Sequence, residues 1–170
     1  MQSVKLVMKT LLFTVLVPGT VGVYVPLYLA GDRMTGDGIS LGLAMGLFTI
    51  GLILYLRCAW DFAADGKGTP APIDRPKRLV VRGFYRYTRN PMYVAVLTVI
   101  AGWAALYRAP VLVAYAVVVS VIFYSFVRFY EEPRLEREFG REYAEYKKRV
   151  GRWLPRIVRR ESTEVASSGS

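Results

Sequence analysis

Four long apolar stretches dominate the hydrophobic pattern of the chain, and short polar segments separate them. The stretches cover residues 6–30, 39–63, 92–107 and 110–127. A helix needs about 20 mainly apolar residues to cross a membrane core of about 30 Å. The first two stretches exceed that length, the third is short, and only Arg108 and Ala109 separate the last two. The pattern therefore predicts an all-α integral membrane protein with about four transmembrane helices, the last two forming a tight hairpin.

The second stretch carries two pairs of residues spaced four apart. Gly42 and Gly46 share one side of the predicted helix, where small residues let another helix approach closely. Arg57 and Asp61 have the same spacing near the other end of the stretch. We expect these two charged side chains to form an ion pair at the membrane surface.

A fifth helix of a different kind follows the last apolar stretch. Its apolar residues recur at steps of three and four, and its other face is densely charged. The apolar residues are Leu135, Phe139, Tyr143, Tyr146, Val150 and Trp153. We expect a C-terminal amphipathic helix that lies in the membrane interface; the alternative is a helix that covers the loop before the third stretch.

The distribution of charge indicates a membrane protein rather than a nucleic-acid-binding one. The formal net charge is +10, from 23 Lys and Arg against 13 Asp and Glu. Apart from Arg33 and Arg108, the basic residues gather near the N-terminus, in residues 57–89 and from residue 128 onward. This asymmetry follows the positive-inside rule and predicts that both termini and the 65–90 loop face the cytoplasm. We expect a multi-pass protein of a prokaryotic inner membrane that contacts membrane lipids and no nucleic acid.

The composition also limits the chemistry that the chain can perform. Histidine is absent, which removes the commonest general base and the commonest metal ligand. Cys58 is the single cysteine, and no spacing of metal-ligating residues occurs. We therefore expect a site without a bound metal.

One polar stretch, residues 81–93, stands between the second and third apolar stretches and contains three arginines and three tyrosines. A lipid-facing helix would not tolerate this composition. Polar irregular backbone is allowed near the bilayer only where protein buries it or where it lines a cavity. Proline suits the first turn of a helix, so Asn90-Pro91 predicts that the next helix begins here. The N-terminus of that helix would favour a carboxylate or another anion.

A second polar group follows the fourth apolar stretch. Arg128 and Glu132 are four residues apart, and therefore share a face if the helix continues. The adjacent Glu131 and Glu132 are costly at the bilayer boundary unless they find cationic partners. We predict that this group meets residues 85–93 at the cytoplasmic end of the bundle and forms a functional site there, rather than a routine band of interfacial charges.

The two groups together resemble a known family. The pattern is Gly83-x-Tyr85-Arg86-Tyr87-x-Arg89-Asn90-Pro91-Met92-Tyr93, then Glu131-Glu132, then Phe139-Gly140-x-x-Tyr143-x-x-Tyr146-x-x-x-Val150. It resembles the isoprenylcysteine carboxyl methyltransferases and is similar to the related phospholipid N-methyltransferases, over about residues 66–155. The chain then divides into two transmembrane helices (1–63), a methyltransferase core of cofactor loop, two further transmembrane helices and amphipathic helix (64–155), and a disordered tail (156–170).

The resemblance implies an integral membrane methyltransferase that uses S-adenosylmethionine without a Rossmann domain. Carried over by position, the residues that would contact this cofactor are Leu79, Val80, Tyr85, Asn90, Pro91, Met92, Tyr93 and Glu132. Arg128 falls where the carboxyl methyltransferases place a substrate-binding arginine. Many members have histidine before this proline, and asparagine at that position can still donate and accept hydrogen bonds.

The type of acceptor follows from the need for a base. A carboxylate is already ionised at neutral pH and needs none, and Arg128 could hold it bidentately, which favours an isoprenylcysteine-like substrate. An amine would need a base, for which Glu131 is the candidate. The alternatives are N- or S-methylation of a phospholipid or small molecule, a non-catalytic membrane scaffold, and a sterol-reductase-like relative, against which the short chain and the glutamate pair argue.

Overall fold

The structure is a computed structural model that describes residue 8 and residues 12–65 and 79–155. The first helix, Leu12–Ala30, includes the π-helical turn η1 (Thr20–Tyr24) and α2 (Val25–Ala30). The later elements are α3 (Gly38–Asp65), the 3-10 helix η2 (Gly83–Arg86), α4 (Pro91–Tyr107), α5 (Pro110–Phe126), the π-helical turn η3 (Val127–Glu131) and α6 (Glu132–Arg149). Strands are absent from the described residues, which confirms the predicted all-α class there. The predicted loop at residues 66–78 and the tail at residues 156–170 lie outside the described residues.

Three helices are long and apolar enough to cross a membrane: Leu12–Ala30, Gly38–Phe62 and Pro110–Arg149. The last has 40 residues, or about 60 Å, which is twice the thickness of a membrane core. Its apolar part is α5, so η3 and the charged α6 lie outside the spanning segment. The apolar α4 has 17 residues, like α5, but it does not continue into a longer helix, and its role as a fourth span stays a prediction.

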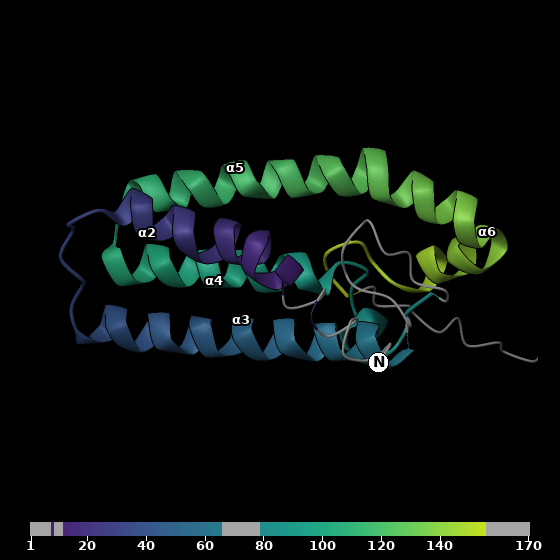
Figure 1. Ribbon diagram of the computed structural model, residues 1–170, viewed down its shortest axis with the longest axis horizontal. Coiled ribbons are helices and arrows are strands. Elements are labelled where there is room, and N and C mark those ends of the chain that lie inside the picture. Colours follow the sequence, from purple (N-terminus) through teal and green to yellow (C-terminus); the bar gives the residue numbers. More distant parts are fainter. Residues whose placement is uncertain (1–7, 9–11, 66–78, 156–170) are drawn as a thin grey trace, which may run out of the picture.

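The helix α4 occupies the centre of the bundle, with α3 on one side and α5 and the first helix on the other (Figure 1). The interface between α3 and α4 is the most extensive one. In it, Gly51 lies against Ala95 and Val99. The close helix approach predicted at Gly42 and Gly46 is wrong, because no other described element comes within 4 Å of where a Cβ would stand at either glycine.

The π-helical turn η1 is held by side chains from two other helices. Trp103 of α4 donates its indole N–H to the carbonyl of Gly22 at 2.9 Å. Tyr115 of α5 donates its hydroxyl to the carbonyl of Val21, also at 2.9 Å. Such side-chain donors satisfy backbone groups in irregular membrane helices. They fix the first helix against α4 and α5, which matters because this helix forms part of the pocket described below.

The hairpin between α4 and α5 forms as the sequence predicts. Arg108 ends α4 in the left-handed region, with φ 47° and ψ 35°, and Pro110 begins α5. The Arg108 guanidinium reaches the Asp37 carboxylate at 3.4 Å. At the other end of α3, the predicted pair of Arg57 and Asp61 is present, with an N···O distance of 3.8 Å.

The helix α6 turns back at the end of the bundle away from this hairpin (Figure 1). The sequence predicts one continuous apolar stripe as far as Trp153, which is wrong in two respects. The backbone at Gly140 has φ 48° and ψ −118°, so the helix is kinked there, and it ends at Arg149. Glycine adopts positive φ without a steric penalty, which allows this kink.

The apolar side chains of α6 pack against the protein. Tyr143, Tyr146 and Val150 are buried and form a cluster with Leu79, which precedes η2. The sequence left open whether this helix covers the loop before the third apolar stretch. The structure shows such a contact at Leu79, the first described residue of the loop's second part. A position at the membrane interface stays a prediction.

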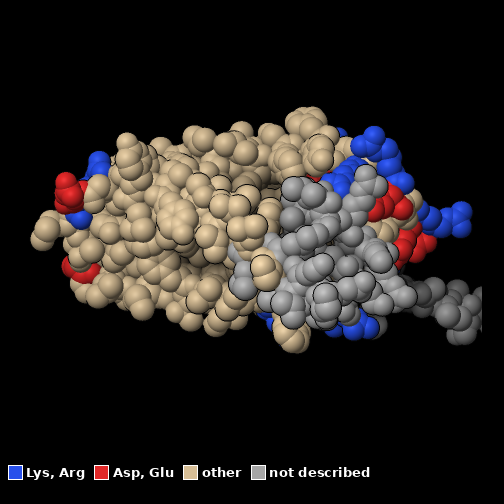
Figure 2. Space-filling model, in the orientation of Figure 1, with Lys and Arg blue, Asp and Glu red and all other residues tan. Residues whose placement is uncertain are grey.

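The charged residues gather at the two ends of the molecule, and a broad band between them is nearly free of charge (Figure 2). The end with the α4–α5 hairpin has few charges. The other end, with α6, has many more. This arrangement fits a bundle whose middle lies in lipid.

Candidate active site

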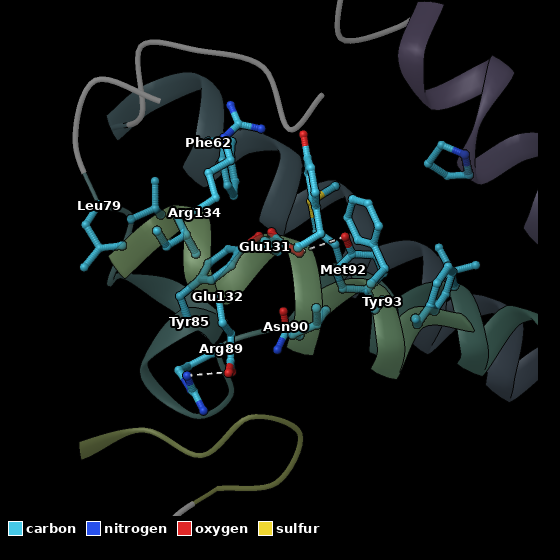
Figure 3. A pocket seen from close by; sticks show the side chains of 18 of the residues that line it. Phe62, Leu79, Tyr85, Arg89, Asn90, Met92, Tyr93, Glu131, Glu132 and Arg134 are labelled. Atoms are coloured by element: carbon cyan, nitrogen blue, oxygen red, sulfur yellow. Dashed lines mark hydrogen bonds and ion pairs between the residues drawn. The ribbon is translucent and has the colours of Figure 1, made fainter. Parts of the chain in front are cut away.

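A pocket of about 470 Å³ lies at the α6 end of the bundle. Its size falls within the range of small-molecule sites. The first helix and α5 contribute apolar side chains, including Phe13, Val17, Ile122 and Phe126. The residues before α4 and after α5 contribute polar ones, including Arg89, Asn90, Glu131, Glu132 and Arg134 (Figure 3). The pocket therefore joins an apolar wall inside the bundle to a polar end.

The turn η2 forms one wall of the pocket and depends on Gly83. This glycine has φ +54°, and Asp61 Oδ2 lies 2.1 Å from where its Cβ would stand. A Cβ there would push the Asp61 carboxylate away, and the positive φ is itself strained for any other residue, so both features favour glycine at this turn. Tyr85 is buried, and its carbonyl accepts a hydrogen bond of 2.6 Å from the Tyr146 hydroxyl. The turn is thus held between α3 and α6.

The helix α4 begins at Pro91, as the sequence predicts. Asn90 has φ −128° and ψ 49°, and its side chain does not cap the helix. Its amide instead donates to the carbonyl of Arg152 at 3.0 Å. The segment after α6 is therefore fastened to the start of α4.

Glu132 is at the centre of a buried charge cluster. Its relative exposure is 3%. Arg152 donates to its two carboxylate oxygens at 2.7 and 2.8 Å, and Arg89 Nη1 lies 2.9 Å from Oε1. Burial alone would raise the pKa of Glu132, but the Arg152 hydrogen bonds and the charges of both arginines hold it below 4.5. Two guanidinium groups surround one carboxylate, so the cluster has a net positive charge.

Arg89 also faces the pocket (Figure 3). Its Nη1 contacts the Tyr143 hydroxyl at 3.2 Å in addition to Glu132. Its Nε is buried and has no hydrogen-bond partner among the described residues. Buried donors are nearly always paired in folded proteins. An unused donor of a positively charged group beside a pocket is suited to an anionic ligand.

Glu131 has a different environment from its neighbour. Its Oε2 accepts a hydrogen bond of 2.9 Å from the Tyr93 hydroxyl (Figure 3). Burial raises the pKa of Glu131, and the Tyr93 hydrogen bond and the nearby Arg134 charge offset this only in part. A carboxylate with a raised pKa in a pocket is a better proton acceptor than an ordinary surface carboxylate. Glu131 is therefore the candidate base of this site.

The structure brings most of the residues implied by the resemblance to this one pocket. Those that line it are Leu79, Val80, Tyr85, Asn90, Met92, Tyr93, Glu131 and Glu132. Pro91 is buried but does not line the pocket. Arg128 is exposed and lies outside the lining. The expectation that it shares a face with Glu132 assumed a continuous α-helix, and the π-helical turn η3 intervenes.

Sequence reasoning missed two arginines and the contribution of the first helix. Arg134 lines the pocket and follows the glutamate pair by two residues, so its position near them was a usable signal. Arg152 meets Glu132 across 20 positions of sequence, which no local pattern predicts. Phe13 and Val17 belong to an apolar run in which nothing distinguishes pocket residues from lipid-facing ones.

The comparison with known families agrees with this arrangement. A family model described as phospholipid methyltransferase matches residues 39–142, which is more than half of the 170 residues. No curated protein sequence matches the chain significantly. The chain therefore belongs to the phospholipid methyltransferase family and is a membrane methyltransferase.

Proposed function

We propose that this methyltransferase transfers a methyl group from S-adenosylmethionine to a lipophilic acceptor inside the pocket. The observation that carries the proposal is the two-part lining, apolar along the first helix and α5 and polar before α4 and after α5. S-adenosylmethionine would supply a methyl group bound to a positive sulfur. The acceptor would bond to the methyl carbon in line as the carbon–sulfur bond breaks, and S-adenosylhomocysteine would leave as a neutral thioether. Aligning a charged and a lipophilic reactant while excluding water accounts for much of the catalysis in such reactions.

The polar end is the part suited to the cofactor. The residues proposed to hold it are Leu79, Val80, Tyr85, Asn90, Pro91, Met92, Tyr93 and Glu132. Pro91 is buried beside the lining residues and would support them. The unused Nε of Arg89 offers a donor for the carboxylate of the cofactor. Because Glu132 is already shared by two arginines, Glu131 is the carboxylate available to balance the positive sulfonium.

The proposed acceptor is a carboxylate, as in an isoprenylcysteine-like substrate. A carboxylate is ionised at neutral pH and needs no base. Arg134 lines the pocket and supplies a cation for it, a role that the resemblance implies for Arg128. The prenyl chain would lie along Phe13 and Ile122, on the apolar wall.

One observation favours a second acceptor class, the amine of a phospholipid. Glu131 is a carboxylate with a raised pKa, hydrogen-bonded to Tyr93, at the polar end of the pocket. An amine that is protonated in water must lose a proton before it attacks, and Glu131 is placed to accept it.

The proposed location is an inner membrane, with four spans, α6 at the interface and the pocket facing the cytoplasm. The gathering of basic residues at the α6 end supports this orientation. In a Cys58→Ser background, a membrane-impermeant thiol reagent applied outside should label Gly36→Cys and spare Arg141→Cys. The opposite pattern would refute the orientation.

The experiment that tests the function uses purified protein, labelled S-adenosylmethionine, and two acceptors offered separately: an acetylated S-farnesylcysteine and phosphatidylethanolamine. A carboxylate acceptor predicts a flat rate from neutral to moderately alkaline pH. An amine acceptor predicts a rate that rises with pH toward the amine pKa. If label enters neither acceptor nor any component of a membrane lipid extract, the proposal is wrong.

Two matched variants then locate the acceptor group. Arg134→Lys keeps the charge but loses the planar fork that fits a carboxylate, so it should raise KM for the farnesylcysteine. Arg128→Lys, on the exposed surface, should leave KM unchanged. The reverse result would restore Arg128 to the role that the resemblance implies for it.

A further inference from the structure

The segment that follows α6 reaches back to the residues before α4. The family match ends at residue 142, so this segment lies beyond it. Gly151 accepts a hydrogen bond of 3.0 Å from the Arg89 backbone N–H and forms a bridge with Thr88. The carbonyl of Arg152 accepts two further bonds of 3.0 Å, from the Thr88 hydroxyl and the Asn90 amide. The backbone of this segment therefore fixes the polar stretch that precedes α4.

The side chain of Arg152 reaches in another direction, toward Glu132. Its Nε and Nη2 donate to the two carboxylate oxygens at 2.7 and 2.8 Å, which is a bidentate pair. The guanidinium also lies 5.6 Å from the centre of the Tyr124 ring. A single residue thus connects the polar stretch, the start of α6 and the end of α5.

The bidentate pair affects how Glu132 interacts with Arg89. With Arg152 present, Arg89 shares Glu132 through Nη1 alone, and its Nε has no partner among the described residues. Without the Arg152 fork, the carboxylate would be free to turn and pair more fully with Arg89. Such a turn would move a guanidinium that lines the pocket and would occupy its donors.

We propose that Arg152 is a positioning residue of this methyltransferase. It is not part of the pocket lining. Its side chain acts through Glu132 and so sets the position of the Arg89 guanidinium, which is proposed to bind the carboxylate of the cofactor. The inference rests on the proposed use of S-adenosylmethionine.

The test compares Arg152→Lys and Arg152→Gln with Arg149→Gln, which removes the same charge at an exposed residue in the last turn of α6. Binding of S-adenosylhomocysteine is measured by calorimetry on the full-length protein in detergent. Lysine keeps the charge but cannot form the fork. Both Arg152 variants should therefore bind about tenfold more weakly or worse, and Arg149→Gln should match wild type.

A second ligand separates positioning from general damage to the fold. Methylthioadenosine has the adenosine and the sulfur but lacks the amino acid. Its affinity should be nearly the same in wild type and in Arg152→Lys, because the groups that Arg152 positions have nothing to bind. A variant that is merely less well folded would lose affinity for both ligands in equal proportion, and that result would overturn the inference.

The remaining outcomes are also decisive. If wild type fails to bind S-adenosylhomocysteine, the proposed function fails rather than this inference alone. If wild type binds it and Arg152→Lys binds it equally well, Arg152 is not a positioning residue. Should Arg152→Gln fail to fold in a thermal melt, the Arg152→Lys titrations give the answer, since that variant keeps the charge beside Glu132.

Discussion

The two ends of the helix bundle use the same pair of chemical groups in opposite settings. At the hairpin end, Arg108 meets Asp37 at 3.4 Å, and their side chains are 66% and 57% exposed. At the pocket end, Arg89 and Arg152 meet Glu132, whose side chain is 4% exposed. Water screens the first pair, and such exposed pairs contribute little to stability. In the second cluster Glu132 and Arg89 are buried and Arg152 is partly exposed, so the buried members depend on one another and on Arg152 for their solvation.

The glycines of the two ends differ in the same way. Gly42 and Gly46, in the half of α3 nearer the hairpin, have the spacing of a helix-packing motif, but no other described element lies within 4 Å of where their Cβ atoms would stand. Gly83, at the pocket end, belongs to no such motif, yet its Cβ position is filled by the Asp61 carboxylate. Whether the fold needs a glycine at a position is therefore decided by the groups around that position, and the sequence motif alone does not decide it.

The largest expected effect is that of Glu132→Ala. Removing this carboxylate leaves two guanidinium groups without their partner, which should lower the free energy of unfolding by roughly 3–5 kcal/mol. Asp37→Ala is the matched change at the hairpin end and should lower the free energy of unfolding by only about 1 kcal/mol. Its ion pair is exposed, and the main loss is the hydrogen bond that Asp37 accepts from the Ser40 N–H at the start of α3. Denaturant unfolding in detergent measures both. Similar losses for the two variants would contradict the contrast between the ends.

The same cluster predicts a dependence of stability on pH. The pKa of Glu132 is lower in the folded protein than its ordinary value of 4.5. Its contribution is therefore fully present above about pH 4.5 and is lost as the pH falls through the lower folded-state pKa. In Glu132→Gln this acid-dependent part should be smaller than in wild type.

The next largest effect concerns Gly83→Ala. The left-handed conformation costs an alanine about 1–2 kcal/mol, and the clash with Asp61 adds to that cost. Gly42→Ala places the same methyl group on an open helix surface and should be neutral or slightly stabilising. Melting temperatures of the two variants provide the measurement. If Gly83→Ala were as stable as wild type, η2 would not need a residue with positive φ at position 83.

The smallest effect is a shift in the pH profile of Tyr93→Phe. The Tyr93 hydroxyl lowers the pKa of Glu131, so its removal should raise that pKa further. If Glu131 is the base for an amine acceptor, the acid limb of the rate profile should move to higher pH by the same amount. Tyr107→Phe, in the last turn of α4 at the hairpin end, is the control and should leave the profile in place. An unshifted profile with an amine acceptor would exclude Glu131 as the base.

The sequence determined the main helices, and the resemblance added much of the polar part of the pocket lining. Apolar length predicted α3 and α5, and the Asn90-Pro91 junction predicted the start of α4. The resemblance placed Tyr93 and Glu131 at one site, and in the structure the Tyr93 hydroxyl donates a hydrogen bond to Glu131. These predictions succeeded because helix propensity, apolar length and proline geometry are local properties, which a few neighbouring residues settle.

The tertiary structure alone decided which arginines serve the pocket and which glycines matter. Arg128 has the right spacing from Glu132 for a shared helix face, but η3 interrupts the α-helix between them. Arg152 reaches Glu132 only because α6 kinks at Gly140 and its chain returns to Thr88. Contacts of this kind depend on how helices pack and where they bend, and those are settled by the whole bundle rather than by the residues on either side of a position.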